Sequence, residues 1–274
     1  MGVGYVLEDT LDLRLTDKIV LVTGSTAGIG FAIARAVAAE GAHVYVNGRT
    51  QQRVDAAVEA VRSLGATIKV DGIVADFSGA SGAETVIAKL PAVDVLVNNV
   101  GIFEPKPFAE IPDADWERLF AVNVMSGVRL SRSYLPGMLE RRWGRVVFVS
   151  SESALNIPAE MVHYGVTKLA QLGVARGLAE SVPGSGVTVN SVLPGPTLTP
   201  ALEAFMDAMI GDEAWSVEEA GQLLIERVRP TSLLGRLATS EEVANLIVYL
   251  SSPQASATTG ASLRVDGGVV RTIA

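Results

Sequence analysis

Tyr164 and Lys168 are a tyrosine and a lysine four residues apart in the sequence. At this spacing two side chains share one face of a helix, with their Cβ atoms about 5–6 Å apart. A free phenol has a pKa near ~10 and is a poor acid or base at neutral pH. One cation at ~4 Å in an effective dielectric of ~20 supplies about 4 kcal/mol, enough to bring that pKa down toward neutrality. The pair therefore predicts a proton-transferring phenol, although an isolated Tyr-x-x-x-Lys match is more often an ordinary amphipathic pair.

A glycine-rich turn near the N-terminus offers a second kind of chemistry. The apolar run 19–22 is typical of a strand buried on both faces of a parallel sheet. Gly24, Gly28 and Gly30 follow it, and residues 31–40 then have a helical pattern. Glycines between a buried strand and a helix allow the backbone to approach a pyrophosphate at the helix N-terminus. This segment predicts a dinucleotide-binding turn.

Strand and helix patterns alternate along the rest of the chain, which predicts a doubly wound α/β fold with a parallel sheet of about seven strands flanked by helices on both faces. Residues 1–17 are interpreted as an N-terminal leader, and 18–274 as a single domain with a helical substrate lid at about 200–228. Further strands are predicted at 44–47, 68–75, 93–97, 146–149, 187–193 and 263–265, and helices at 51–64, 80–90, 113–142, 159–182, 201–228 and 241–250.

The composition narrows the classes of partner. The net charge is −8 and no basic block is present, so we expect no nucleic-acid partner. With no cysteine and only two histidines, we expect no metal site. No signal peptide and no run of 18 uninterrupted apolar residues is found, so we expect a cytoplasmic protein without membrane contact. A small-molecule substrate is the remaining expectation.

Several short motifs follow one another along the chain. They are Thr23-Gly24-x-x-x-Gly28-Ile29-Gly30, Asn98-Asn99-Val100-Gly101, Ser151, Tyr164-x-x-x-Lys168 and Pro194-Gly195. In this order and spacing the chain resembles the short-chain dehydrogenases/reductases, from about Asp17 to the C-terminus. The resemblance implies a Rossmann-like fold and an NAD(P)-dependent oxidoreductase that moves hydride between nicotinamide and a small alcohol or ketone.

The resemblance also implies catalytic roles. Tyr164 is expected to be the general acid/base, and Lys168 to lower its pKa, hold the nicotinamide ribose and join a proton relay. Ser151, which lies 13 residues before Tyr164, is expected to hydrogen-bond the substrate oxygen. Asn123 resembles the asparagine that positions a water behind the lysine.

Cofactor contacts are implied at a wider set of positions. They are Gly24, Ser25, Thr26, Gly28, Ile29, Gly30, Arg49, Asp76, Asn98, Asn99, Gly101, Tyr164, Lys168, Pro194, Gly195 and Thr199. After the second strand the sequence is Asn47-Gly48-Arg49, without the carboxylate that NAD-dependent members use for the ribose 2′-hydroxyl. Arg49 suits a 2′-phosphate, whereas Ala27 lacks the basic character of many NADP-dependent members. NADP is favoured and NAD stays open.

The less regular segments are expected to select the substrate. Those expected around the nicotinamide are Phe103, Asn156, Met161, His163, Phe205, Met206, Met209 and Trp215, with His163 expected to be a pocket or interface residue. The segment 200–228 is interpreted as a mobile lid, with a helical cap on its own core as the alternative. The resemblance implies a homotetramer or homodimer. Two other functions are weighed: an epimerase-type relative, which has a different glycine spacing, and a dinucleotide-sensing regulator, which would lack part of the Ser-Tyr-Lys set.

Overall fold

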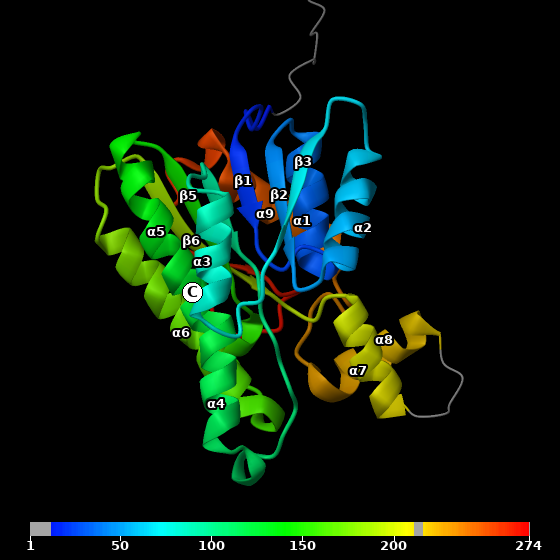
Figure 1. Ribbon diagram of the computed structural model, residues 1–274. Helices are drawn as coiled ribbons and strands as arrows, with labels where there is room; N and C mark the ends of the chain where they lie inside the picture. The colour runs from blue at the N-terminus through cyan, green and yellow to red at the C-terminus, as the bar shows by residue number, and fades with distance from the viewer. Residues whose placement is uncertain (1–11, 211–215, 274) are drawn as a thin grey trace, which may run out of the picture.

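The computed structural model describes residues 12–210 and 216–273, so most of the predicted leader lies outside it. Its centre is one seven-stranded parallel sheet, as predicted, and the strand order is β3-β2-β1-β4-β5-β6-β7 (Figure 1). The strands are β1 (Ile19–Val22), β2 (His43–Gly48), β3 (Lys69–Val74), β4 (Val95–Asn98), β5 (Gly144–Val149), β6 (Val187–Pro194) and β7 (Ser262–Val265).

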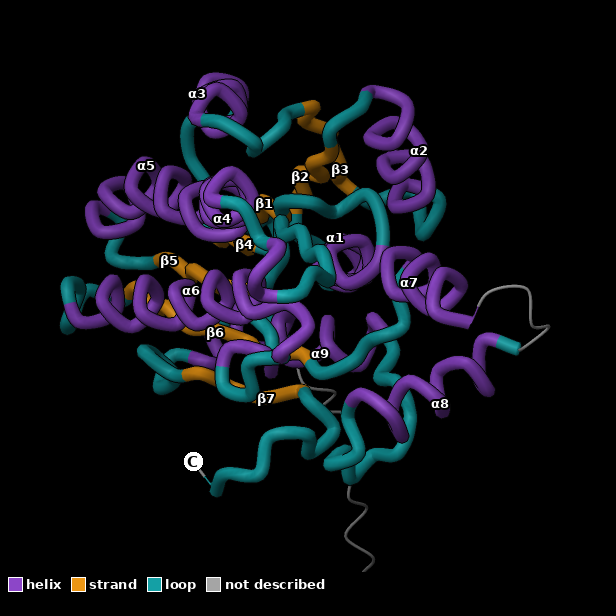
Figure 2. The backbone as a smooth tube through the Cα atoms, turned by 90° about the horizontal axis from the view of Figure 1, so that it is seen from below, coloured by secondary structure: helices purple, strands orange, loops and turns teal. Residues whose placement is uncertain are grey.

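Helices cover both faces of the sheet. They are α1 (Gly28–Ala39), α2 (Gln51–Arg62), α3 (Ala80–Lys89), α4 (Asp113–Phe120), α5 (Ser126–Glu140), α6 (Val162–Glu180), α7 (Pro200–Ile210), α8 (Val217–Val228) and α9 (Ser240–Ser251). Alternate strand residues point to opposite faces. Val20 and Val22 therefore pack with α1, α2 and α9, whereas Leu21 packs on the side of α3, α5 and α6. Figure 2 shows these two helical layers from below.

The strand order reverses beside β1. The chain runs from β1 to β2 and β3 on one side, then crosses to β4 on the other. A crevice at the carboxyl ends of the strands is expected at such a reversal, and the N-terminus of α1 opens there. Figure 1 shows α7 and α8 beyond the same ends of the strands. The fold thus places a turn, a helix N-terminus and two further helices around one crevice.

One predicted helix, 113–142, is interrupted. The structure has α4, a π-helical segment η2 (Ala121–Met125) and then α5. Asn123 lies in η2, where its Oδ1 accepts from Ile102 N at 2.8 Å and its Nδ2 donates to Ile102 O at 2.9 Å. These side-chain bonds to a distant backbone replace regular helical continuity, and π-bulges of this kind are frequent at functional sites. The predicted helix 159–182 likewise begins later, because η4 (Ala159–Met161) precedes α6.

Helices α7 and α8 share a small apolar cluster of their own. Met206, Ala220 and Leu224 are buried in it, and Leu198 and Leu202 pack against them. This cluster is what the helical-cap alternative expected, and the lid remains a prediction. Among residues 12–210 and 216–273, no helix combines the length and the apolar character needed to cross a bilayer.

Candidate active site

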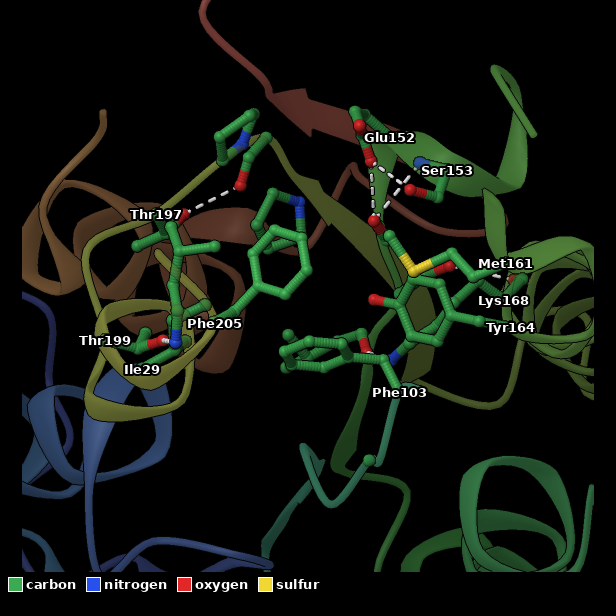
Figure 3. Close-up of a pocket in the computed structure, with 18 of the residues that line it drawn as sticks. Ile29, Phe103, Glu152, Ser153, Met161, Tyr164, Lys168, Thr197, Thr199 and Phe205 are labelled. Carbon is green, nitrogen blue, oxygen red and sulfur yellow. Dashed lines mark hydrogen bonds between the residues drawn. The ribbon is translucent and has the colours of Figure 1, made fainter. Parts of the chain in front are cut away.

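A cavity at the carboxyl ends of the strands brings the predicted proton-transfer residues together. Ser151, Tyr164 and Lys168 all line it, and Phe205 lies on the opposite wall. Figure 3 shows the Tyr164 hydroxyl directed into this cavity, with Phe103 beneath the ring. The Phe103 and Tyr164 rings meet edge to face, with centroids 6.0 Å apart. Ser151 and Lys168 are 17 positions apart in the sequence, with Tyr164 between them, and all three line the same cavity.

Helix α6 presents Tyr164 and Lys168 on one face because they lie four residues apart in it. Gly165 lies between them, where an added Cβ would come within 2.8 Å of Ile157 Cγ2 and 3.0 Å of Ser153 O. This position needs a residue without a side chain, so that α6 can approach the segment after β5. This close approach places Ser151, in the segment after β5, near Tyr164 of α6.

Lys168 is held by the backbone rather than by a carboxylate. Its Nζ donates to Val149 O at 2.9 Å, and the residue is buried. An added Cβ at Gly101 would lie 3.2 Å from the same nitrogen. Asn123 is close by and buried, but its Nδ2 donates to Thr167 Oγ1 and its main-chain oxygen accepts from Gln171 Nε2 at 2.6 Å. The position of Asn123 agrees with the predicted one, and its water-binding role stays a prediction.

The electrostatics of the pair differ from the expectation. Burial raises the pKa of Tyr164 to about 12, although the neighbouring Ser151 hydroxyl acts in the opposite direction. Burial lowers the pKa of Lys168 to about 8. The lysine nitrogen lies 5.7 Å from the centroid of the tyrosine ring and does not reverse the effect of burial. The predicted lowering of the Tyr164 pKa by Lys168 is therefore wrong for the protein alone.

The glycine turn has the backbone geometry that its sequence predicts. Gly24 and Gly28 adopt φ values of +62° and +54°, in the left-handed region that favours glycine. An added Cβ at Gly30 would lie 2.4 Å from Asn99 Nδ2, and that amide donates to the carbonyl oxygens of Thr23 and Gly24. The turn is thus tied to the end of β4 and leaves a cradle at the N-terminus of α1.

A second pocket adjoins the cavity on the side of β2. It is lined by Gly24, Thr26, Arg49, Asp76, Asn99 and Gly101 of the predicted set, together with Arg53. Asn99, Gly101 and Ile102 line both pockets, so the two form one continuous groove. Ile29, Pro194, Gly195 and Thr199 line the cavity end of that groove.

Two predicted side chains point elsewhere. Ser25 is buried, donates to Val22 O and accepts from Asn47 N. Asn98 is buried with its Nδ2 donating to Ser131 Oγ at 3.3 Å, toward α5. Neither side chain lines the groove, so any cofactor contact of theirs must come from the backbone.

Comparison with known proteins identifies the family. The family whose model matches residues 24–270 is described as enoyl-(acyl carrier protein) reductase. The chain is 44% identical over 263 residues to an uncharacterized oxidoreductase, YvaG, of Bacillus subtilis, covering 96% of this chain and 100% of the relative. The chain belongs to the short-chain dehydrogenase/reductase family. Its members are NAD(P)-dependent oxidoreductases, and the epimerase and regulator alternatives are not favoured.

Solved structures of this family are closely similar. L-sorbose reductase from Gluconobacter frateurii, complexed with NADPH and L-sorbose, superimposes with a TM-score of 0.90 at 29% identity, covering 96% of this chain and all of that one. 7α-Hydroxysteroid dehydrogenase, complexed with NADH and a 7-oxo bile acid, gives a TM-score of 0.81 at 30% identity, covering 96% and 98%.

Of the residues expected to surround the nicotinamide in this short-chain dehydrogenase/reductase, only some line the cavity. Phe103, Met161 and Phe205 line the cavity. The expectation for His163 is wrong: it is fully buried with its ring against Trp116, 5.9 Å between centroids, because it points from α6 toward α4. Other predicted lining residues do not reach the cavity or are not described: Asn156 is exposed, Met206 is buried in the α7–α8 cluster, the Met209 side chain is not described, and Trp215 lies outside the described residues.

Several lining residues were missed by the sequence argument. Glu152 and Arg229 line the cavity as a buried ion pair, and Thr197 lies opposite them. The sequence position of Glu152, directly after Ser151, was the one signal that could have indicated its place in the cavity wall. Arg53 and Arg229 gave none, because Arg53 lies in a predicted helix and Arg229 directly follows one, where a charged residue is usually solvated.

Proposed function

We propose that this protein is an alcohol dehydrogenase/carbonyl reductase that interconverts a small ketone and its alcohol. The observation that carries the proposal is the convergence of Ser151, Tyr164 and Lys168 on one cavity that continues into the groove of the glycine turn. The cavity wall is largely apolar, as expected of a pocket for a small uncharged molecule. The resemblance to L-sorbose reductase supports a ketone substrate.

In reduction, Tyr164 donates its proton to the carbonyl oxygen, and Ser151 holds that oxygen by a hydrogen bond. A bound nicotinamide would supply the hydride. The raised pKa keeps the Tyr164 hydroxyl protonated at neutral pH, which suits the proton donor of the reductive direction. Lys168, fixed on Val149 O, provides a positive charge beside the phenol and stabilises the phenolate that remains. In oxidation the tyrosine must first lose its proton, so the rate of alcohol oxidation is expected to rise with pH.

The groove fits a nicotinamide dinucleotide. Gly24 and Gly28 place no side chain of their own over the N-terminus of α1, where a pyrophosphate would bind. Asp76 and Asn99 would hold the adenosine half, and Pro194, Gly195 and Thr199 would lie beside the nicotinamide.

Arg49 and Arg53 support NADP rather than NAD. Both line the pocket at the carboxyl end of β2, where a 2′-phosphate would lie. The residue at this strand end is Gly48 rather than the carboxylate of NAD-dependent relatives, and an added Cβ there would lie 2.5 Å from Thr26 Cγ2, so a side chain would require Thr26 to move. Two arginines, with no carboxylate at the end of β2 itself, are an arrangement that favours a phosphate.

Replacing Arg49 with serine should lower kcat/KM for NADPH by about tenfold to a hundredfold, because a charge-assisted hydrogen bond is lost. The value for NADH should change little. Steady-state kinetics with both cofactors measure the effect, and Arg62→Ser, an exposed arginine on α2, is the matched control. An equal loss with both cofactors would remove the assignment of Arg49 to the 2′-phosphate.

We also propose a cytoplasmic homotetramer or homodimer, with α5 and α6 as the contact. These two helices lie side by side on one face of the sheet (Figure 2), and Leu169 on α6 is an exposed apolar residue. Light scattering coupled to gel filtration is expected to give a multiple of the chain mass, and Leu169→Glu is expected to reduce it. A monomeric mass for the wild type at micromolar concentration would exclude the assembly.

A screen of ketones and alcohols with NADPH, NADH and their oxidised forms tests the function. Ketone-dependent oxidation of NADPH, followed at the nicotinamide absorbance, is the expected result. A folded protein that binds NADPH yet turns over no ketone or alcohol would contradict the proposal.

A further inference from the structure

A buried ion pair lies beside the Ser151 hydroxyl. Glu152 is 3% exposed and Arg229 is 7% exposed, and Arg229 Nε donates to Glu152 Oε1 at 2.5 Å. Arg229 directly follows α8, so the helix pair next to the cavity supplies this cation. Figure 3 shows Glu152 on the same side of the cavity as Tyr164, hydrogen-bonded to its neighbours.

The other carboxylate oxygen accepts from two serines. Ser151 Oγ donates to Glu152 Oε2 at 2.7 Å, and Ser153 Oγ donates to the same oxygen at 2.6 Å. A serine hydroxyl has a single proton to donate. The proton of Ser151 is therefore committed to Glu152, and Ser151 cannot donate it to a substrate oxygen without breaking this bond.

Arg229 is the charge partner of the buried Glu152 carboxylate. A buried carboxylate persists as an anion only when it is paired and hydrogen-bonded. The pair is neutral as a unit, and the exposed Glu160 carboxylate lies 3.5 Å from Arg229 Nη1. An anionic group on a substrate would therefore find no uncompensated cation here. The group that this wall can accept is a hydrogen-bond donor, such as a hydroxyl.

Building on the carbonyl chemistry proposed above, we propose that Glu152 selects ketones with a hydroxyl group on the carbon next to the carbonyl. The substrate hydroxyl donates a hydrogen bond to Glu152 Oε2 in place of Ser151, and the released Ser151 hydroxyl donates a hydrogen bond to the carbonyl oxygen, while Tyr164 remains the proton donor. Two adjacent oxygens on the substrate suit two partners, Ser151 Oγ and Glu152 Oε2, that are 2.7 Å apart. The number of hydrogen bonds on Glu152 is conserved in this exchange.

A plain ketone has no such replacement. To accept a hydrogen bond from Ser151 it must leave Glu152 Oε2 with one bond fewer, and the loss of a bond to a buried charged group is costly. Glu152 is thus a specificity-determining residue, which acts on the choice of substrate more than on the rate of proton transfer.

Hydroxyacetone and butanone test this selection, because they have the same number of heavy atoms and differ by hydroxyl against methyl. The wild type is expected to show a kcat/KM for hydroxyacetone at least about tenfold above that for butanone. Glu152→Gln should lower this ratio by about tenfold, since it replaces a charged acceptor with a neutral one. Glu160→Gln removes the same charge from the other carboxylate near Arg229 without a contact to Ser151, and should keep the ratio.

Ser153→Ala gives an independent readout should Glu152→Gln prove unfolded by thermal melting. It frees one acceptor position on Glu152 Oε2, so the ratio should rise severalfold. An unchanged ratio in Ser153→Ala, equal rates for the two ketones in the wild type, or an unchanged ratio in folded Glu152→Gln would overturn the inference and leave the carbonyl chemistry standing. Absence of turnover with every carbonyl compound would instead refute the proposed function.

Discussion

Tyr164→Phe is expected to lower the ketone-reduction rate by about 10²–10⁴-fold, the usual contribution of a positioned general acid. The substitution removes one oxygen atom and keeps the ring, which meets Phe103 edge to face. The fold and the groove of the glycine turn lie outside the reach of that oxygen, so NADPH affinity should change little. The rate comes from steady-state kinetics, and the affinity from the quenching of tryptophan fluorescence.

Tyr249→Phe is the matched control for this variant. Tyr249 lies on α9 and packs against the core on the side of α1 and α9, away from the cavity. Its loss of a hydroxyl should leave kcat unchanged. Near-normal turnover in Tyr164→Phe would show that another group supplies the proton, and the mechanism would have to be abandoned.

Lys168→Met is expected to change how stability depends on pH. The folded-state pKa of Lys168 is about 8, below its ordinary value of 10.5. Between these values the unfolded chain holds a proton that the folded chain has released, so the free energy of unfolding of the wild type rises as the pH increases. This rise from Lys168 is at most about 3 kcal/mol over the whole interval, and the methionine variant should lack it.

Denaturant unfolding of both proteins between about pH 7 and pH 10 measures the difference. Staying below pH 10 avoids the opposite contribution of Tyr164, whose raised pKa makes stability fall between its ordinary value of 10.0 and about 12. Lys89→Met, at an exposed lysine on α3, should follow the wild type. If the Lys168→Met curve also runs parallel to that of the wild type, Lys168 does not have the depressed pKa. The same variant should lose most of its turnover, since the phenolate of Tyr164 loses its cation.

Much of the fold follows from local patterns in the sequence. The buried β-branched runs at β1 and β4 and the glycines after β1 are strong signals, because only a parallel sheet buries both faces of such strands. The alternation of strands and helices then leaves few possible topologies. The approach of Tyr164, Lys168 and Ser151 could likewise be predicted, since the family motifs have a fixed order.

Other features depend on contacts between distant segments. In the π-helical segment η2, Asn123 bonds the backbone of Ile102, a contact between distant segments that helical periodicity does not reveal. The Glu152–Arg229 pair joins positions 77 residues apart. The raised pKa of Tyr164 results from burial, a property of the assembled cavity, and the pair geometry alone predicted the opposite direction.

The most direct test of the account uses NADPH that carries deuterium at both C4 positions of the nicotinamide. Incubated with the wild type and hydroxyacetone, it should yield an alcohol with one deuterium on the former carbonyl carbon, detected by mass spectrometry. Tyr164→Phe should give the same labelled product far more slowly. An alcohol without deuterium, or no alcohol from any ketone that the folded protein is given, would contradict hydride transfer at this site.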